Sequence, residues 1–501
     1  MTLRSLLFGG AGCLLLSFVA PTLMRAQGLS DVMLYSRMDP LGTARSTGLG
    51  GAMTSLGADL GAVSSNPAGL GMYRTSDVGM SLAIGAGGGR TTFADQTQTT
   101  AAPHLIVGQI GAALTMPLNH PQFRRGTFSI GYTPLRDLHQ RVEWTGPQAG
   151  ESLTQQLALQ AQGTPFDSLW YSQPFDADLA WYTYLIDTVS GSVDQYEGAF
   201  NGDDVQQSLR RDRSGRMGET TLAFGTSYDD VLHLGLSVGL TSIDMERVDV
   251  YSERKQMGPS PLDRFTFNDR LEVSGSGAFW AFGLILQPEN TPLRFGWSYR
   301  SGSVFSIDDF YQVDATSDFS DGTGYEWNSP NSYVQYRIRT PRQHRLGFSW
   351  TVGKAALLTL DYGYSDFAQA TFTSNDFRAE DVAAIQRDID STLVAEQQVR
   401  GGLEFRIQDT WRFRFGGGWQ SAAAQPLQGF DGVEDGTLLE DGSQRIQWAI
   451  GGEYRAETWY AGATYRHTST EDARRLYALS PAIAEGRTGL GLLMLSIGAR
   501  Y

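Results

Sequence analysis

The residues that could carry out chemistry are few in this chain of 501 amino acids. None of the histidines are paired at the spacing of zinc ligands; they occupy positions 104, 120, 139, 233, 344 and 467. The single cysteine, Cys13, lies in an apolar N-terminal stretch whose removal would leave no thiol. No nucleophile motif accompanies the serines, as a hydrolase would require. We therefore expect no catalytic residues, no metal site and no cofactor, and an enzyme is the weakest of the function classes considered below.

Arginine is the second residue type with a chemical use, because a guanidinium can hold a carboxylate through two parallel hydrogen bonds. Several arginines fall on the polar face of alternating segments: Arg294, Arg300, Arg400, Arg406, Arg412 and Arg414. If these side chains share a watery interior, they could bind the head group of a ligand. The alternative, which we favour, is a solvated lattice of structural ion pairs with Glu404 and Glu453. The sequence leaves both readings open.

The segments that carry these arginines alternate with period two, as strands with two different faces do. The same pattern recurs in segments 77–85, 293–300, 399–407, 411–418, 446–455 and 493–501. One face is aromatic and aliphatic, whereas the other holds arginine, glutamate and glycine. A lipid-facing exterior and a water-filled interior explain both faces. The sequence therefore predicts an all-β fold, a transmembrane antiparallel β-barrel.

We expect about fourteen strands in a barrel that spans residues 73–501: 73–88, 104–118, 127–145, 216–228, 231–253, 265–288, 292–313, 331–352, 354–372, 396–408, 410–421, 443–455, 457–468 and 487–501. Their connections alternate in length, as the short periplasmic turns and long external loops of outer-membrane barrels do. The main expected external loops are 146–215, 373–395 and 422–442. The first two include helical stretches at 151–162, 176–186 and 379–394.

Residues 1–26 have the features of a secretory signal peptide, with Arg4 before an apolar run at 6–20 and Ala26 at the expected cleavage point. No later run of about 18 apolar residues predicts a transmembrane helix. The chain has 39 Lys and Arg against 54 Asp and Glu, a formal charge of −15, which argues against a nucleic-acid partner. These features favour the outer membrane of a Gram-negative bacterium, with its lipids and lipopolysaccharide as surroundings.

Residues 27–72 precede the first strand, are rich in small residues and do not alternate. About 45 residues are too many for an ordinary connection and too few for a separate domain, so we expect them inside the lumen as a hatch, a plug of the barrel. The hatch holds a motif, Asn66-Pro67-Ala68-Gly69, in which the proline fixes φ, the asparagine can bond nearby backbone and the glycine permits a tight reversal. Shaping a rigid plug and moving to release a ligand are both compatible with this motif.

The hatch segments 42–51 (GTARSTGLGG), 52–58 (AMTSLGA) and 65–70 (SNPAGL) resemble the FadL-type family of outer-membrane transporters of long-chain fatty acids and other hydrophobic compounds. Segments 174–187, 271–286, 339–348 and 359–367 are similar more weakly, especially to its hemin-receptor-like branch. The resemblance implies a fourteen-stranded barrel plugged by an N-terminal hatch, the same strand number that alternation gives. The sequence shows no obvious axial ligand for a heme.

The third expected strand contains Gly131 and Pro134. A proline in a barrel wall removes a ladder hydrogen bond and belongs at a bulge or a local edge. In the resembled family the third strand kinks inward and opens a lateral gap, so the resemblance implies such a gap at these two residues. A bulge near the rim without a role in transport is the alternative.

The leading hypothesis is passive uptake of a hydrophobic small molecule, such as a long-chain fatty acid, by a monomeric barrel with lateral release into the membrane. The alternative is a docking or shuttle component of a protein secretion system, which some barrels with this hatch pattern are. An apolar pocket beneath the external loops would favour transport, whereas a flat exposed loop surface would favour docking.

Overall fold

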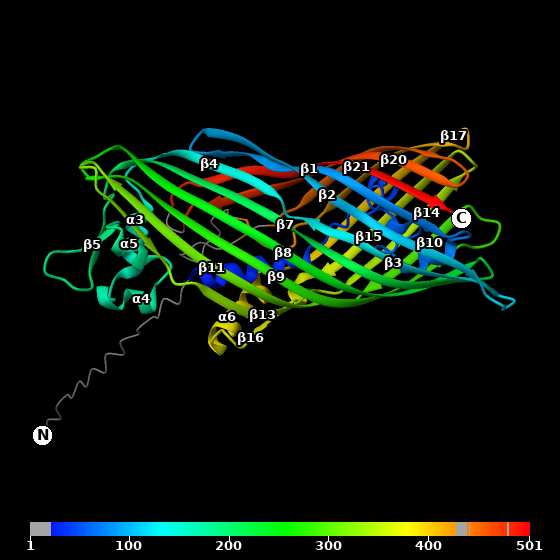
Figure 1. The fold of residues 1–501 in the computed structure, drawn as a ribbon, viewed down its shortest axis with the longest axis horizontal. Helices are drawn as coiled ribbons and strands as arrows, with labels where there is room; N and C mark the ends of the chain where they lie inside the picture. Colours follow the sequence, from blue (N-terminus) through cyan, green and yellow to red (C-terminus); the bar gives the residue numbers. More distant parts are fainter. Residues whose placement is uncertain (1–21, 427–437, 440, 478–479) are drawn as a thin grey trace, which may run out of the picture.

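A computed structural model describes residues 22–426, 438–439, 441–477 and 480–501. The described chain forms fourteen antiparallel strand paths, which close into a barrel because β1 pairs with β2 on one side and with β21 on the other (Figure 1). Closure removes the two free outer edges that an open sheet of these strands would have. The expected fold and strand number are thus confirmed. Residues 1–21 of the predicted signal peptide, which include Cys13, lie outside the described residues. So does most of the expected loop 422–442.

Ten paths are single strands: β1 (Asp77–Phe93), β2 (Gln96–Pro117), β7 (Asp204–Tyr228), β8 (Leu232–Met257), β9 (Leu262–Leu286), β17 (Ala395–Ile407), β18 (Trp411–Gln420), β19 (Arg445–Arg455), β20 (Trp459–Arg475) and β21 (Ile483–Arg500). Four paths are interrupted: β3 (Phe123–Asp137) with β4 (Gln140–Gln148), β10 (Leu293–Arg300) with β11 (Val304–Phe319), β14 (Gln343–Val352) with β13 (Ser332–Arg339), and β15 (Ala356–Asp366) with β16 (Thr371–Ser374). A short strand, β12 (Gly324–Asn328), forms a hairpin with β11.

The outer face of the wall carries an apolar band of exposed side chains, among them Ile84, Leu105, Leu240, Leu346 and Ile497. Exposed aromatic residues follow the rim near the C-terminus: Trp350, Trp411, Trp459 and Tyr501. An apolar band with aromatic residues at its edges is the lipid-facing surface of an outer-membrane barrel, and it places the chain in the outer membrane. Within the described residues, no helix is both long and apolar enough to span a bilayer.

The strands extend well beyond the membrane on the external side. β7, β8 and β9 have 25, 26 and 25 residues, about 80 Å of strand, whereas the hydrocarbon core is only about 30 Å thick. The expected loop 146–215 is therefore shorter, because β4 continues to Gln148 and β7 begins at Asp204. The strand expected at 216–228 begins earlier, at Asp204, because the exposed residues in the first half of β7 are polar and do not alternate with apolar ones: Arg210, Ser214 and Arg216.

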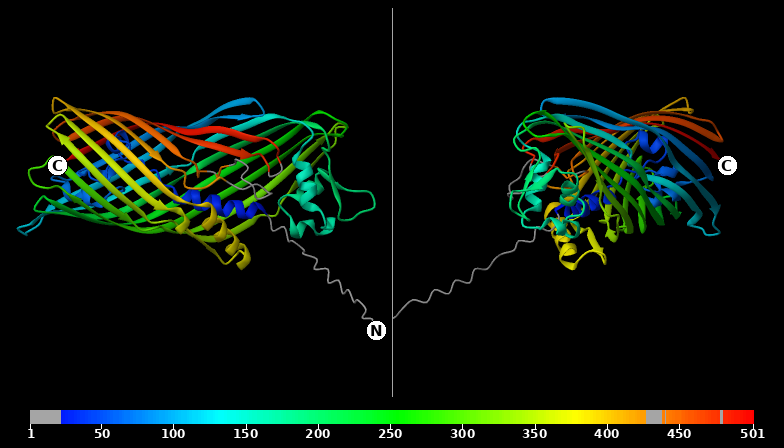
Figure 2. Two further views of the ribbon diagram at one scale, coloured as in Figure 1. Left: turned by 180° about the vertical axis from the view of Figure 1, so that it is seen from behind. Right: turned by 60° about the vertical axis from the view of Figure 1, so that its left-hand side comes forward.

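The segment from α1 to the start of β1 lies inside the barrel (Figure 2). α1 (Thr22–Ser36) occupies the external half of the lumen, and the residues after it form α2 (Ala44–Gly48) and the 3-10 turns η1 (Leu60–Ala62) and η2 (Pro67–Met72). A cleavage after Ala26, as the sequence predicts, would shorten α1. The remaining part of the helix includes Leu29, Val32 and Met33, which pack against the wall. We call residues 39–72 the hatch base.

A small external subdomain lies at the end of the barrel that is opposite to the C-terminus (Figure 2). It comprises α3 (Leu153–Ala161), η3 (Phe166–Ser168), α4 (Leu169–Ser172), α5 (Ala177–Tyr182), β5 (Ile186–Thr188) and β6 (Tyr196–Gly198). Another helix, α6 (Ala379–Thr392), packs beside α1. The helices expected at 151–162, 176–186 and 379–394 are therefore present, with slightly shorter bounds.

Candidate functional site

The hatch base rests on glycines of the barrel wall. Paired glycines face it from neighbouring strands, namely Gly225, Gly235 and Gly283 on β7–β9, Gly296 and Gly347 on β10 and β14, and Gly402 and Gly416 on β17 and β18. A Cβ added to Gly225 would lie 2.6 Å from Leu70 Cβ, and one added to Gly347 would lie 2.7 Å from Ser55 N. These glycines, which we call the glycine belt, let the hatch backbone approach the wall more closely than any side chain would allow.

The motif predicted from the sequence lies at this contact. The carboxamide nitrogen of Asn66 donates to the carbonyl of Thr54 at 2.7 Å and to those of Leu284 and Trp297 in the wall, at 3.1 and 3.3 Å. Its oxygen accepts from Ala68 N at 3.0 Å and so caps η2, which begins at Pro67. Gly69 N donates to the Asn66 carbonyl at 3.1 Å. The motif thus joins two parts of the hatch base to β9 and β10.

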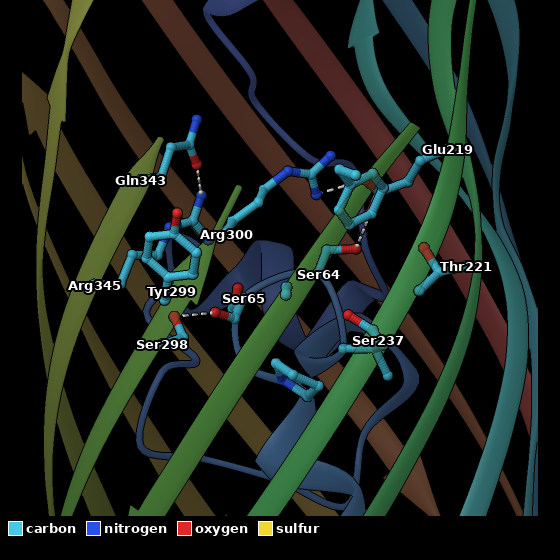
Figure 3. A pocket seen from close by; sticks show the side chains of 14 residues that line it. Ser64, Ser65, Glu219, Thr221, Ser237, Ser298, Tyr299, Arg300, Gln343 and Arg345 are labelled. Atoms are coloured by element: carbon cyan, nitrogen blue, oxygen red, sulfur yellow. Dashed lines mark hydrogen bonds and ion pairs between the residues drawn. The ribbon is translucent and has the colours of Figure 1, made fainter. Parts of the chain in front are cut away.

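A polar layer lies directly above the hatch base (Figure 3). Arg300 pairs with Glu219 at 2.7 Å, and Ser64 donates to the same carboxylate at 2.8 Å. Ser298 donates to the carbonyl of Ser65 at 2.7 Å. The cavity between these residues is about 10 Å³, room for one water molecule. This contact between the hatch base and the wall therefore leaves no cavity large enough for a ligand between its lining residues.

The arginines singled out from the sequence have different surroundings. Arg412 and Arg414 form ion pairs with Glu404 and Glu453, joined by Arg45 of α2. Arg406 pairs with Asp409 in the turn after β17, at the exposed rim of the barrel. The favoured lattice of ion pairs accounts for the positions of Arg412 and Arg414 and, through Glu219, for that of Arg300.

Arg400 differs from Arg300, Arg412 and Arg414 because it forms no ion pair within the described residues. It is 6 % exposed, and its Nε and one terminal nitrogen have no hydrogen-bond acceptor among those residues. It stands on β17 beside Gly51 of the hatch base, where a Cβ on the glycine would be 3.2 Å from the guanidinium. Arg294, partly buried near the other end of the hatch base, likewise has no ion pair within the described part of the chain. Of the two, Arg400 is the buried one.

An apolar chamber lies above the polar layer, and α1 fills it. The helix contributes Leu29, Val32 and Met33, all buried, to a cluster with side chains of the wall: Leu135, Leu138, Met217, Ile243, Met245, Leu271, Val273, Phe305 and Ile307. Arg37, directly after α1, pairs with Glu396 at 2.6 Å, with both side chains fully buried. The lumen therefore has an apolar compartment whose present occupant is part of the chain itself.

The wall has a seam where β3 leaves β2. The β2–β3 ladder ends at the pair Ile110–Tyr132, and in the described residues β2 beyond this point pairs with β1 alone, while β4 pairs with β7 alone. We call the boundary between residues 96–109 of β2 and residues 133–148 the seam. The β3–β7 register shifts between Pro134 and Arg136, which is the bulge that a proline in a wall leads one to expect. Gly131 lies one residue before the last ladder pair.

The hatch supplies hydrogen bonds that β2 does not supply at the seam. The backbone N–H groups of Leu41 and Asp39 donate to the carbonyls of Pro134 and Leu135, both at 2.8 Å. Arg136 donates to the carbonyl of Leu34 at 3.0 Å. Because the end of α1 and the start of the hatch base bond to the β3 edge, a displacement of residues 34–41 would change the seam as well.

Sequence reasoning missed a cluster of three chemical groups at the seam. His104 of β2 and His139 of the β3–β4 corner both contact the carboxylate of Asp137. The histidine spacing in the sequence gave no sign of this cluster, because the fold brings His104 into contact with Asp137, which lies 33 positions away, and so next to His139. No local spacing could reveal this pair, and only the position of Pro134 pointed to the corner.

A buried acid of the barrel wall holds the external subdomain in place. Glu253 of β8 accepts hydrogen bonds from Leu153 N at 2.9 Å and from Ser152 and Tyr251 at 2.5 Å. Burial raises the pKa of Glu253 above its ordinary value, against the effect of these donors. The contact anchors the start of α3 to the barrel wall.

Comparisons with known proteins support the fold. No protein-family model matches the chain, and no curated protein matches it by sequence. Among solved structures, a FadL homologue from Pseudomonas aeruginosa aligns with a TM-score of 0.52 at 12 % identity, over 93 % of this chain and 99 % of the other. The toluene transporter TodX from P. putida aligns with a TM-score of 0.51 at 12 % identity, over 92 % and 99 %. The chain therefore shares the architecture of these barrels over nearly its whole length.

Proposed function

We propose that this protein mediates passive uptake of a hydrophobic small molecule across the outer membrane, with a long-chain fatty acid as the leading candidate. The observation that carries the proposal is an apolar chamber that adjoins a seam in the wall. Leu135 and Leu138 belong to the chamber and flank the β3–β4 corner. Transfer of an alkyl chain from water to such a chamber is favourable by about 0.8 kcal/mol per CH₂.

The layers of the lumen suit an amphiphile. The apolar chamber lies above a layer with unpaired cationic charge, so the tail of a fatty acid would replace α1 and its carboxylate would point toward the hatch base. Arg400 is the best receptor for the head group, because its buried guanidinium has donors to spare. Release would then be lateral, through the seam, since the hatch base closes the axial route.

We predict that Arg400→Gln weakens fatty-acid binding about ten- to hundredfold, because a hydrogen bond to a charged group is worth about 1.5–3 kcal/mol. Binding of an alkane of the same length should change little. Titration of a fluorescent fatty acid into the refolded barrel, in competition with the unlabelled ligands, measures both affinities. Arg406→Gln, at the rim, is the matched control. Equal losses for acid and alkane would contradict a head-group role.

We predict that Pro134→Val slows uptake and leaves binding unchanged. The Pro134 carbonyl bonds to Leu41 of the hatch base and not to β7, so the N–H that valine restores would point to the same edge, where residues 39–41 close the seam. One added ladder bond is worth about 1 kcal/mol, which would hold the seam closed roughly fivefold more of the time. Fatty-acid entry into liposomes that contain the barrel measures the rate, with Pro147→Val in β4 as control. An unchanged rate would rule out release at this corner.

One observation favours the alternative, a docking role in protein secretion. The external subdomain and β12 expose several aromatic side chains: Tyr171, Tyr182, Tyr184, Tyr325 and Trp327. Tyr182 stacks on Trp327 with ring centroids 4.1 Å apart, and the ring centroids of Tyr184 and Tyr325 are 4.5 Å apart. Aromatic residues are enriched in protein interfaces. If the folded wild-type barrel binds no fatty acid, this surface becomes the better guide, and pull-down of a secreted protein is the next experiment.

A further inference from the structure

Three side chains from two separated strands meet at the seam. His104 Nε2 lies 2.8 Å from one oxygen of the Asp137 carboxylate, and His139 Nδ1 lies 2.9 Å from the other. The two imidazole rings stack with centroids 3.9 Å apart and planes inclined by 18°. His104 belongs to β2, whereas Asp137 and His139 belong to the corner that β2 does not pair with. The cluster thus crosses the seam by side chains alone.

The hydrogen bond on the far side of His104 fixes its tautomer. Nδ1 lies 2.9 Å from the carbonyl of Ala102, which can only accept, so Nδ1 carries a proton. In the neutral ring Nε2 then has none, and its lone pair faces a carboxylate oxygen. Two acceptors at 2.8 Å repel each other unless a cation lies between them or the ring is charged. A histidine that donates one N–H to a backbone carbonyl and turns the other nitrogen inward is the usual arrangement of a metal ligand.

The wall makes room for this cluster. Gly85 and Gly87 of β1 face it from behind: a Cβ on Gly85 would lie 3.1 Å from His104 Nε2, and one on Gly87 would fall on the His139 carbonyl. The side chains of His104 and Asp137 are 12 % and 2 % exposed, whereas that of His139 is 34 % exposed. The group is therefore nearly enclosed, with one side through which a small ion can reach it.

We propose that His104, Asp137 and His139 bind one Zn²⁺ ion, which joins β2 to the β3–β4 corner across the seam. Two imidazoles and a carboxylate are a ligand set that zinc takes, with water as the fourth ligand. Tetrahedral zinc with bonds near 2.0–2.1 Å holds its ligand atoms roughly 3.3 Å apart. The separations of the two ring nitrogens from the carboxylate, 2.8 and 2.9 Å, need to widen by a few tenths of an ångström. The two stacked rings must also turn apart, so that both lone pairs point at the ion.

The consequence for transport rests on the proposed function, although the site itself does not. A bound ion replaces the missing backbone ladder with three coordinate bonds and so keeps the seam closed. Fatty-acid entry into liposomes should therefore slow in the presence of zinc and recover when a chelator is added. His104→Ala should make entry insensitive to zinc. Zinc binding without any fatty-acid uptake would leave the site standing and remove the transport proposal.

Calorimetric titration of ZnCl₂ into the purified, refolded protein tests the site. The wild type should bind one equivalent, and His104→Ala should bind at least tenfold more weakly, as loss of one of three ligands implies. His120→Ala, in the turn at the other end of β2, is the matched control and should bind as the wild type does. Binding that is equally strong in His104→Ala, or a loss in His120→Ala as large as that in His104→Ala, overturns the proposal.

A conservative variant separates ligation from folding. His104→Cys puts a thiolate, also a zinc ligand, into a chain whose only other cysteine lies in the signal segment. This variant should regain binding that His104→Ala loses, and Co²⁺ should give it a thiolate-to-metal absorption band that the wild type lacks. If the refolded His104→Cys protein binds Co²⁺ without that band, residue 104 is not a ligand and the proposal fails.

Discussion

Gly235→Ala will loosen the hatch base, although it adds a single methyl group. The new Cβ would fall on the backbone atoms of Pro67 and Ala68, which cannot move aside as a flexible side chain can. Overpacking of this kind costs about 1–3 kcal/mol, so peptides from residues 57–72 should exchange amide hydrogens roughly ten- to hundredfold faster. Hydrogen–deuterium exchange with mass spectrometry on the detergent-refolded barrel measures the change.

The control for this substitution is Gly401→Ala on β17. Its Cβ would have 3.8 Å to the nearest atom and would point away from the hatch base, so exchange in residues 57–72 should stay at the wild-type rate. If Gly235→Ala leaves the amides of residues 57–72 fully protected from exchange, there is room for a methyl group between the hatch base and the wall. The glycine belt would then have no part in closing the axial route, and release toward the periplasm would regain weight against lateral release.

The barrel could be predicted because its outer face repeats the same physical requirement on every strand. Lipid demands an apolar side chain at each second residue, so the membrane part of the strands was visible in the sequence. Above the membrane both faces of β7, β8 and β9 meet water or protein, as at Ser242 and Asp244. Alternation fades there, which is why strand ends and the external loop 146–215 were misplaced.

The site could be predicted only where a residue type determines the backbone conformation at its own position. Pro134 predicts a break in the wall, and the Asn66 motif predicts a tight turn. The sequence could not predict which glycines face the hatch, because that depends on register across strands. The surroundings of Arg400 depend on the packing of the hatch against the wall, and the meeting of His104 with His139 depends on the corner at residues 138–139. No spacing in the sequence encodes either.

Arg37→Met will release α1 from the apolar chamber. Arg37 is fully buried and pairs with Glu396 at 2.6 Å. It also donates to the carbonyls of Asp441 and Ser443 at 2.5 Å and of Ser421 at 2.9 Å. Methionine fills similar space without charge and leaves the carboxylate of Glu396 buried and unpaired, a loss of about 3–5 kcal/mol. Amide exchange in residues 28–38 should therefore rise by two or more orders of magnitude.

A double substitution separates the lost ion pair from a general loss of packing. Arg37→Met with Glu396→Leu removes both buried charges, so it should recover much of the protection that the single variant loses. Arg378→Met is a second control, because its pairs with Glu380 and Asp381 are exposed and worth less than about 1 kcal/mol. A double variant as unprotected as Arg37→Met would show that the ion pair does not hold the helix.

The same variant tests whether α1 guards the ligand site. While the helix fills the chamber, a ligand binds only the fraction of molecules in which it has withdrawn, and its apparent affinity is reduced by that fraction. Arg37→Met raises the fraction, so the affinity for a fatty acid should increase at the same time as protection of α1 falls. If α1 instead contributes part of the binding surface, affinity falls together with protection. The sign of the change in Kd therefore decides whether α1 competes with the ligand or helps to bind it.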